Sequence, residues 1–86
     1  MKLRKDVAVS EAGLVFNPTT GESFSVNPIG VEILNLMREG KKFDAICASI
    51  TGQYNTDKDT FEKDFQDFTG VLRQHDLLVP DEKKKA

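Results

Sequence analysis

Hydrophobic and polar residues alternate near the start of the chain in the manner of short β-strands. Residues 6–10 and 14–17 carry Val7, Val9, Leu14 and Phe16 at every second position, and Glu11-Ala12-Gly13 separates the two runs. Such alternation predicts strands with one apolar face, and the short break predicts a tight hairpin. We therefore expect two short strands, with these four side chains on their apolar face.

A third strand is expected directly after the strongest turn signal in the sequence. Asn17-Pro18-Thr19-Thr20-Gly21 combines a proline with a glycine that tolerates positive φ. Residues 22–26 then alternate again, with Phe24 and Val26 on one face and Ser23 and Ser25 on the other. Asn27-Pro28 is typical of a helix start, with asparagine as the cap and proline at the first helical position.

Three helical segments follow, each with apolar residues three and four positions apart. The first covers about 28–39 and ends at Gly40, and the second covers about 43–54. The third begins at the capping-box pattern Thr56-Asp57-Lys58-Asp59. The apolar positions are Ile29, Ile33, Leu36 and Met37 in the first, Phe43, Ile46, Cys47, Ile50 and Tyr54 in the second, and Phe61, Phe65, Phe68 and Leu72 in the third.

This order of elements predicts an α+β fold, a three-stranded antiparallel sheet followed by three helices, similar to a winged helix-turn-helix. With 86 residues, the chain has apolar material for one core. We expect one domain over residues 1–80 and a disordered, charged tail over residues 81–86.

Composition limits the compartment and the chemistry. Cys47 is the only cysteine, and no apolar segment follows the basic start, so we expect a reducing cytoplasm. No apolar run approaches the ~20 residues that cross a bilayer. His75 is the only histidine, with no base in a recognisable relation to Cys47, and ligands at metal-binding spacing are lacking. We predict no enzymatic activity, metal or cofactor, with Cys47 in the core and His75 at the surface or its boundary.

A winged helix suggests DNA binding, but the charge of the third helix argues against it. Residues 57–67 hold five acidic residues and only Lys58 and Lys63 as bases, which would repel the phosphates that a recognition helix must approach. The phenylalanine stripe of this helix is expected to be mostly core. At ~100° per residue, Asp64, Val71 and His75 lie on one flank beside Phe68 and could line a groove.

Together these residues resemble the PqqD-like family, the RiPP recognition elements, from Val9 to Val79. The most specific part is Asn17-Pro18-Thr19-Thr20-Gly21-Glu22-Ser23-Phe24-Ser25-Val26-Asn27. The pattern continues in order through Gly30, Ile33-Leu34, Gly40, Ile46, Tyr54, Asp64, Phe68, Leu72 and Leu77-Leu78. The chain departs from the family at Lys42, where a serine or threonine cap is usual, at Thr69 and at Gly70.

The resemblance implies a peptide chaperone that binds the leader segment of a ribosomally made precursor peptide as an added β-strand. The modifying enzyme it serves would be a radical SAM protein or an HPr-kinase-related protein, and the chain would be a monomer or weak homodimer without nucleic acid or membrane as a partner. The implied peptide-binding residues are Glu22, Ser23, Phe24, Ser25, Val26, Phe61, Asp64, Phe65, Phe68 and Val71. A winged-helix DNA-binding module and a dimerising structural module remain as alternatives.

Overall fold

The computed structural model of the chain describes residues 2–79. Its elements are β1 (Lys2–Leu3), β2 (Ala8–Val9), β3 (Leu14–Asn17), β4 (Glu22–Ser25), α1 (Pro28–Arg38), α2 (Phe43–Gln53), α3 (Lys58–Gln74) and β5 (Leu78–Val79). The expected α+β fold is confirmed, because a three-stranded antiparallel sheet precedes three helices. Pro80 and the expected charged tail, residues 81–86, lie outside the described residues.

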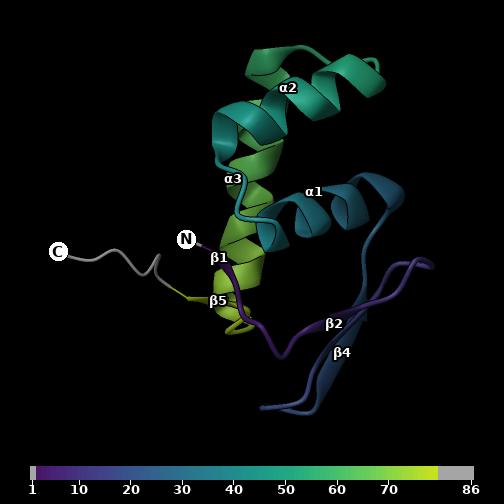
Figure 1. Cartoon of the computed structure of the whole chain (residues 1–86), viewed down its shortest axis with the longest axis vertical. Helices are drawn as coiled ribbons and strands as arrows, with labels where there is room; N and C mark the ends of the chain where they lie inside the picture. The colour runs from purple at the N-terminus through teal and green to yellow at the C-terminus, as the bar shows by residue number, and fades with distance from the viewer. Residues whose placement is uncertain (1, 80–86) are drawn as a thin grey trace, which may run out of the picture.

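The long helix α3 organises the molecule (Figure 1). Helices α1 and α2 cross it, and the sheet of β2, β3 and β4 lies toward its C-terminal end. The figures also place β1 and β5 near that end, which leaves the hairpin of β3 and β4 projecting beyond the helices. None of the helices described between residues 2 and 79 is long and apolar enough to cross a membrane.

The face of β3 that packs inward differs from the sequence expectation. Val15 and Asn17 are buried, whereas Leu14 is 50% and Phe16 is 40% exposed. The expected apolar face of Leu14 and Phe16 is therefore wrong. Residues 14–16 are all apolar, so alternation alone does not decide whether the odd- or the even-numbered residues face the core.

A second, two-stranded sheet was not predicted from the sequence. β1 pairs antiparallel with β5, with Leu3 opposite Leu78, and both leucines are buried. The Arg4 N–H also donates to the Leu77 carbonyl at 2.9 Å. This pairing joins the start of the described chain to the segment after α3, and its two leucines cover the core at that end of the helix.

Two of the predicted helix starts are confirmed, and the third is displaced by one residue. The Asn27 side chain accepts a hydrogen bond from Gly30 N–H at 2.8 Å and caps α1 as expected. α2 begins after Lys42 without a side-chain cap. α3 is capped by Asp57, which accepts from Thr60 N–H at 2.8 Å, so the capping box expected at Thr56 does not form.

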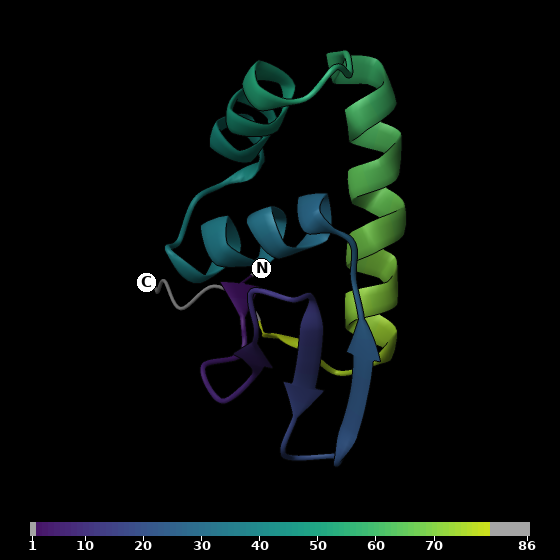
Figure 2. The ribbon, with the colours of Figure 1, turned by 90° about the vertical axis from the view of Figure 1, so that its right-hand side faces the viewer.

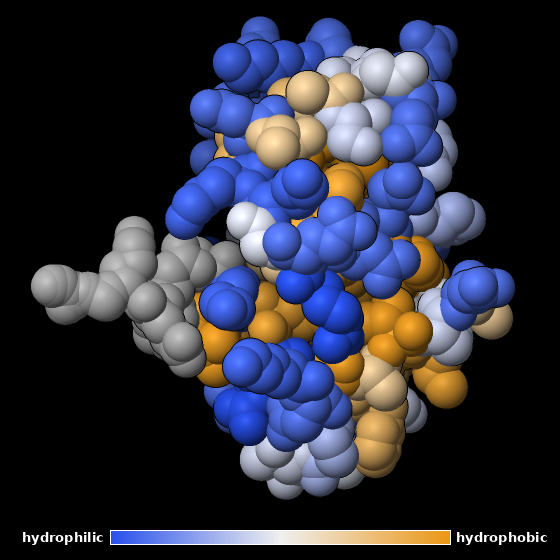
Figure 3. Space-filling view, in the orientation of Figure 1, coloured by the Kyte–Doolittle hydropathy of each residue, from blue (hydrophilic) through white to orange (hydrophobic). Residues whose placement is uncertain are grey.

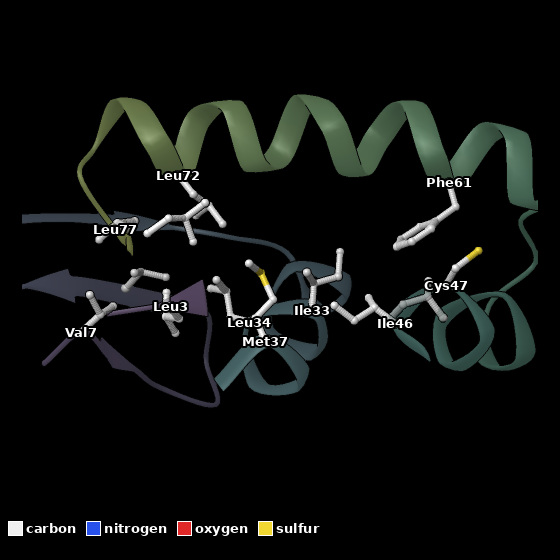
Figure 4. Packing of buried hydrophobic residues seen from close by; sticks show 13 residues of the cluster. Leu3, Val7, Ile33, Leu34, Met37, Ile46, Cys47, Phe61, Leu72 and Leu77 are labelled. Carbon is white, nitrogen blue, oxygen red and sulfur yellow. The ribbon is translucent and has the colours of Figure 1, made fainter. Parts of the chain in front are cut away.

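The hydrophobic core runs along the inner side of α3 (Figure 4). Leu72 and Leu77 meet Leu3 and Val7 at the sheet end, and Phe61 meets Cys47 at the α2 end. Cys47 is 6% exposed, which agrees with its expected place in the core. The complete cluster is Leu3, Val7, Val15, Ile33, Leu34, Met37, Ile46, Cys47, Ile50, Phe61, Leu72, Leu77 and Leu78.

The C-terminal end of α3 is joined to the turn between β3 and β4. Asp76 has a left-handed φ of 58°, and Leu77 N–H donates to the Leu72 carbonyl in a Schellman arrangement. The fully buried Asn17 donates from its Nδ2 to the carbonyls of His75 at 3.2 Å and Asp76 at 3.4 Å. Asn17 thus satisfies carbonyls that the helix end leaves without internal partners and holds the hairpin against α3.

Candidate functional site

β4 is an edge strand of the three-stranded sheet. In the part of the chain that the structure describes, β3 lies on one side of β4 and no strand lies on the other. Val26 N–H donates to the Gly13 carbonyl at 2.7 Å and anchors the end of the strand to β3. A Cβ at Gly13 would lie 2.3 Å from the carbonyl oxygen of Val26, so the close approach of the two backbones requires glycine at position 13.

The register determines which backbone groups of β4 face its open edge. Hydrogen-bonded and non-hydrogen-bonded pairs alternate along an antiparallel ladder. Since Gly13 and Val26 form a bonded pair, Phe24 opposite Val15 forms the next one. The N–H and C=O groups of Ser23 and Ser25 therefore point away from β3, toward the open edge.

The C-terminal end of α3 lies beside the end of β4 from which the chain continues to α1 (Figure 2). His75 connects the two elements: its ring stacks on Phe24 with centroids 4.9 Å apart, and its Nδ1 lies 3.1 Å from Glu22 Oε1. The backbones of β4 and α3 do not pack as closely as those of β4 and β3. His75 thus joins the C-terminal end of α3 to β4, and the open edge of β4 with the flank of α3 that carries His75 is the candidate peptide-binding groove.

Three predicted residues lie on the helix flank that carries His75. Phe68 is half-buried against the core, Val71 is 43% exposed and Asp64 is exposed. At ~100° per residue, all three fall within about 60° of His75 on the helix surface. Ser23 and Ser25 are exposed on the facing strand, whereas Phe24 and Val26 are half-buried and pack against the core.

Phe61 and Phe65, also predicted as peptide contacts, lie elsewhere. Phe61 is 3% exposed and belongs to the core. Phe65 packs on Phe43 and Phe61, with centroids 5.1 and 5.7 Å away. It lines a separate shallow hollow on the other flank of α3, with Phe43, Glu62, Gln66, Thr69 and Arg73. Phe61 and Phe65 therefore support α3 from within and do not lie on the flank that carries His75.

The flank of α3 that carries His75 also carries an exposed acidic side chain, Asp64, about 20° from His75 around the helix. Asp67 is exposed about 80° away, and Asp59 lies on the other side of the helix. At the start of the helix, hydrogen bonding from Thr60 lowers the pKa of Asp57 below its ordinary value. Among residues 2–79, no group of three or more His, Cys, Asp and Glu side chains is placed to hold a metal ion.

The contacts of His75 could not be anticipated from the sequence. Glu22 and His75 are 53 positions apart, and neither forms part of a local motif. The helical spacing placed His75 on the groove flank, but only the folded chain shows that it touches β4. This arrangement can accept one extended peptide: the strand edge offers unpaired backbone donors and acceptors, and the helix flank offers apolar and acidic side chains.

Comparison with protein families shows what the chain is similar to. A family model described as "Coenzyme PQQ synthesis protein D (PqqD)" matches residues 13–78. That range includes β3, β4, all three helices and every groove residue named above. Among curated proteins, no match is found.

Two solved structures are similar over nearly the whole chain. "TbiB1 in Complex with the TbiA(beta) Leader Peptide" is 28% identical, with a TM-score of 0.84, and covers 96% of this chain and 100% of that chain. "Lasso peptide synthetase B1 complexed with the leader peptide" is 18% identical, with a TM-score of 0.79, and covers 92% of this chain and 96% of that chain. The second likeness shows the fold alone.

Proposed function

This chain belongs to the PqqD family, and we propose that it binds the leader segment of a ribosomally made precursor peptide and presents the peptide to a modifying enzyme. The leader adds to the sheet as a strand beside β4. The observation that carries this function is the open edge of β4, to which His75 joins the C-terminal end of α3.

The backbone groups of Ser23 and Ser25 supply affinity that does not depend on the leader sequence. Strand addition satisfies edge donors and acceptors that otherwise bond only to water. Specificity comes from the side chains that the leader meets on α3. Phe68 and Val71 favour apolar residues there, and Asp64 favours a basic one.

The comparisons support this function. The two similar structures are complexes with leader peptides, and one of them is named a lasso peptide synthetase component. In our account this chain is a binding protein and the chemistry belongs to a separate enzyme, a radical SAM protein or an HPr-kinase-related protein. Both partners meet in the cytoplasm, where the precursor peptide is made.

A pair of proline variants tests strand addition. Ser25→Pro removes a donor from the open edge, where proline is tolerated, whereas Phe24→Pro removes a donor from the ladder with β3. The probe is a set of peptides selected on the wild-type protein from a displayed random library of about 15 residues, long enough for one strand. We expect Ser25→Pro to fold and to lose about tenfold or more in affinity, and Phe24→Pro to unfold.

Equal peptide affinity of the wild type and a folded Ser25→Pro variant would overturn strand addition at β4. The same edge could instead pair two copies of the chain. In that case, the molecular mass would rise with protein concentration in the absence of peptide, and Ser25→Pro would abolish the rise. We expect a monomer over the concentrations at which the selected peptides bind.

A further inference from the structure

The outer face of the three-stranded sheet carries two large apolar side chains that the groove does not use. Leu14 and Phe16 of β3 are 50% and 40% exposed. They point away from the core, on the side of the sheet opposite to Val15. Figure 3 shows hydrophobic residues at the molecular surface over this sheet.

The other side chains on this face are small and uncharged. The register forms two rows across the sheet, Ala8-Phe16-Ser23 and Ser10-Leu14-Ser25. None of these six side chains is charged, although the solvent face of an antiparallel sheet ordinarily carries polar residues. Each row ends at the open edge of β4 in a serine.

The serines leave a route from the open edge to the apolar side chains. In a strand added beside β4, the residue opposite Ser25 lies on the same face as Leu14, with Ser25 between them. Strands are about 4.8 Å apart, so this residue and Leu14 are separated by about 10 Å between backbones. A short side chain cannot span that distance, but a leucine, phenylalanine or tyrosine can lie over the serine and contact Leu14.

We infer that the bound leader segment carries bulky apolar side chains on both faces of its strand, and that the outward ones pack across Ser23 and Ser25 on Phe16 and Leu14. This inference rests on the proposed strand addition and specifies the class of peptide that adds. The inward residues meet Phe68 and Val71, so the segment is buried on both faces. Strands buried on both faces have consecutive rather than alternating apolar residues.

The test selects peptides from the same displayed random library on three proteins. These are the wild type, the double variant Leu14→Ser/Phe16→Ser and the single variant Val71→Ser. Val71 is 43% exposed but lies on the inward side. Because all three positions are exposed, the variants are expected to fold, which thermal unfolding verifies. Each selected peptide is then titrated against all three proteins and against Ser25→Pro.

We expect the wild type to enrich runs of about three or more consecutive bulky apolar residues, and the double variant to enrich alternating sequences. Wild-type-selected peptides should bind the double variant about tenfold more weakly. A peptide with alanine at an outward position should bind the wild type and the double variant with equal affinity. A peptide with alanine at an inward position should bind the wild type and Val71→Ser with equal affinity. These two patterns assign each peptide residue to one face.

Two results would overturn the inference, and they are distinguishable. If Ser25→Pro abolishes binding but the double variant binds as tightly as the wild type, strand addition holds and the outer face takes no part. If Ser25→Pro binds as tightly as the wild type, the proposed function itself fails, and the inference fails with it.

Discussion

The imidazole ring of His75 stacks on the phenyl ring of Phe24, with centroids 4.9 Å and planes 28° apart. This contact joins the C-cap residue of α3 to the edge strand β4. It lies beside the hydrogen bond from Asn17 to the His75 carbonyl, so both the side chain and the backbone of His75 hold the hairpin. His75 therefore helps to set the position of the open edge relative to the helix flank.

Replacing His75 separates stacking from hydrogen bonding. His75→Ala removes the stack on Phe24 and the contact with Glu22, and we expect it to lower the free energy of unfolding by about 1–2 kcal/mol. His75→Phe keeps the stack and should lose about half as much. Urea unfolding of both variants measures the difference. A His75→Ala variant as stable as the wild type would show that the two elements are held without this contact.

Asn17 should be costly to replace, because its fully buried amide group donates to two carbonyls at the end of α3. Asn17→Ala leaves the His75 and Asp76 carbonyls without this donor, and we expect a loss of about 2 kcal/mol in urea unfolding. Asn17→Asp keeps the size and the acceptor for Thr19 N–H but removes the donor. The two variants should therefore be similarly unstable. Near-wild-type stability of Asn17→Asp would instead show that Asn17 stabilises the fold through its bond with Thr19 N–H in the turn.

The cap of α3 predicts a loss of stability in acid. Hydrogen bonding from Thr60 lowers the pKa of Asp57 in the folded chain below its ordinary value of 3.8. The stabilisation is therefore present above that ordinary value and is lost as the pH falls through the lower folded pKa. Asp57→Asn caps equally well but does not titrate in this range.

The measurement is urea unfolding of the wild type and Asp57→Asn at about pH 6 and about pH 3. The wild type should lose more stability than the variant between the two values. Thr56→Ala is the matched control, since Thr56 does not cap the helix, and its pH dependence should follow that of the wild type. If the wild type and Asp57→Asn lose the same free energy of unfolding between the two pH values, the ionised Asp57 carboxylate does not stabilise the start of α3.

Charge on the groove flank should affect peptides with a basic residue. Asp64→Lys reverses an exposed charge on the flank of α3 that carries His75, and we expect such peptides to bind about two- to fivefold more weakly at low salt. Glu62→Lys makes the same change on the other flank, beside Phe65, and should leave the affinity unchanged. Equal effects of both variants would indicate general attraction to an acidic protein rather than contact in the groove.

Local signals in the sequence predicted much of the fold. Asn17 to Asn27 contains a turn, an alternating strand and a helix cap, and each of these signals spans only a few residues. For the same reason, the groove flank of α3 follows from helical spacing, which places Asp64, Phe68, Val71 and His75 together.

The features that were missed depend on contacts between distant residues. β1 and β5 are two residues each, and their pairing joins the two ends of the described chain without a pattern in either. Leu14-Val15-Phe16 is apolar at every position, so only packing in the core decides that Val15 turns inward. The exposure of Leu14 and Phe16 on the outer face of the sheet therefore could not be predicted from the sequence.

Hydrogen exchange of the Ser23 and Ser25 amides, measured with and without a library-selected peptide, tests strand addition to β4 most directly. Both amides face the open edge, so they should exchange rapidly in the free protein and slow by about tenfold or more when the peptide binds. The Phe24 amide, bonded to β3, should exchange slowly in both states. If the peptide binds while Ser23 and Ser25 still exchange rapidly, and protection appears instead in α1 or α2, the peptide does not extend β4 and the account is contradicted.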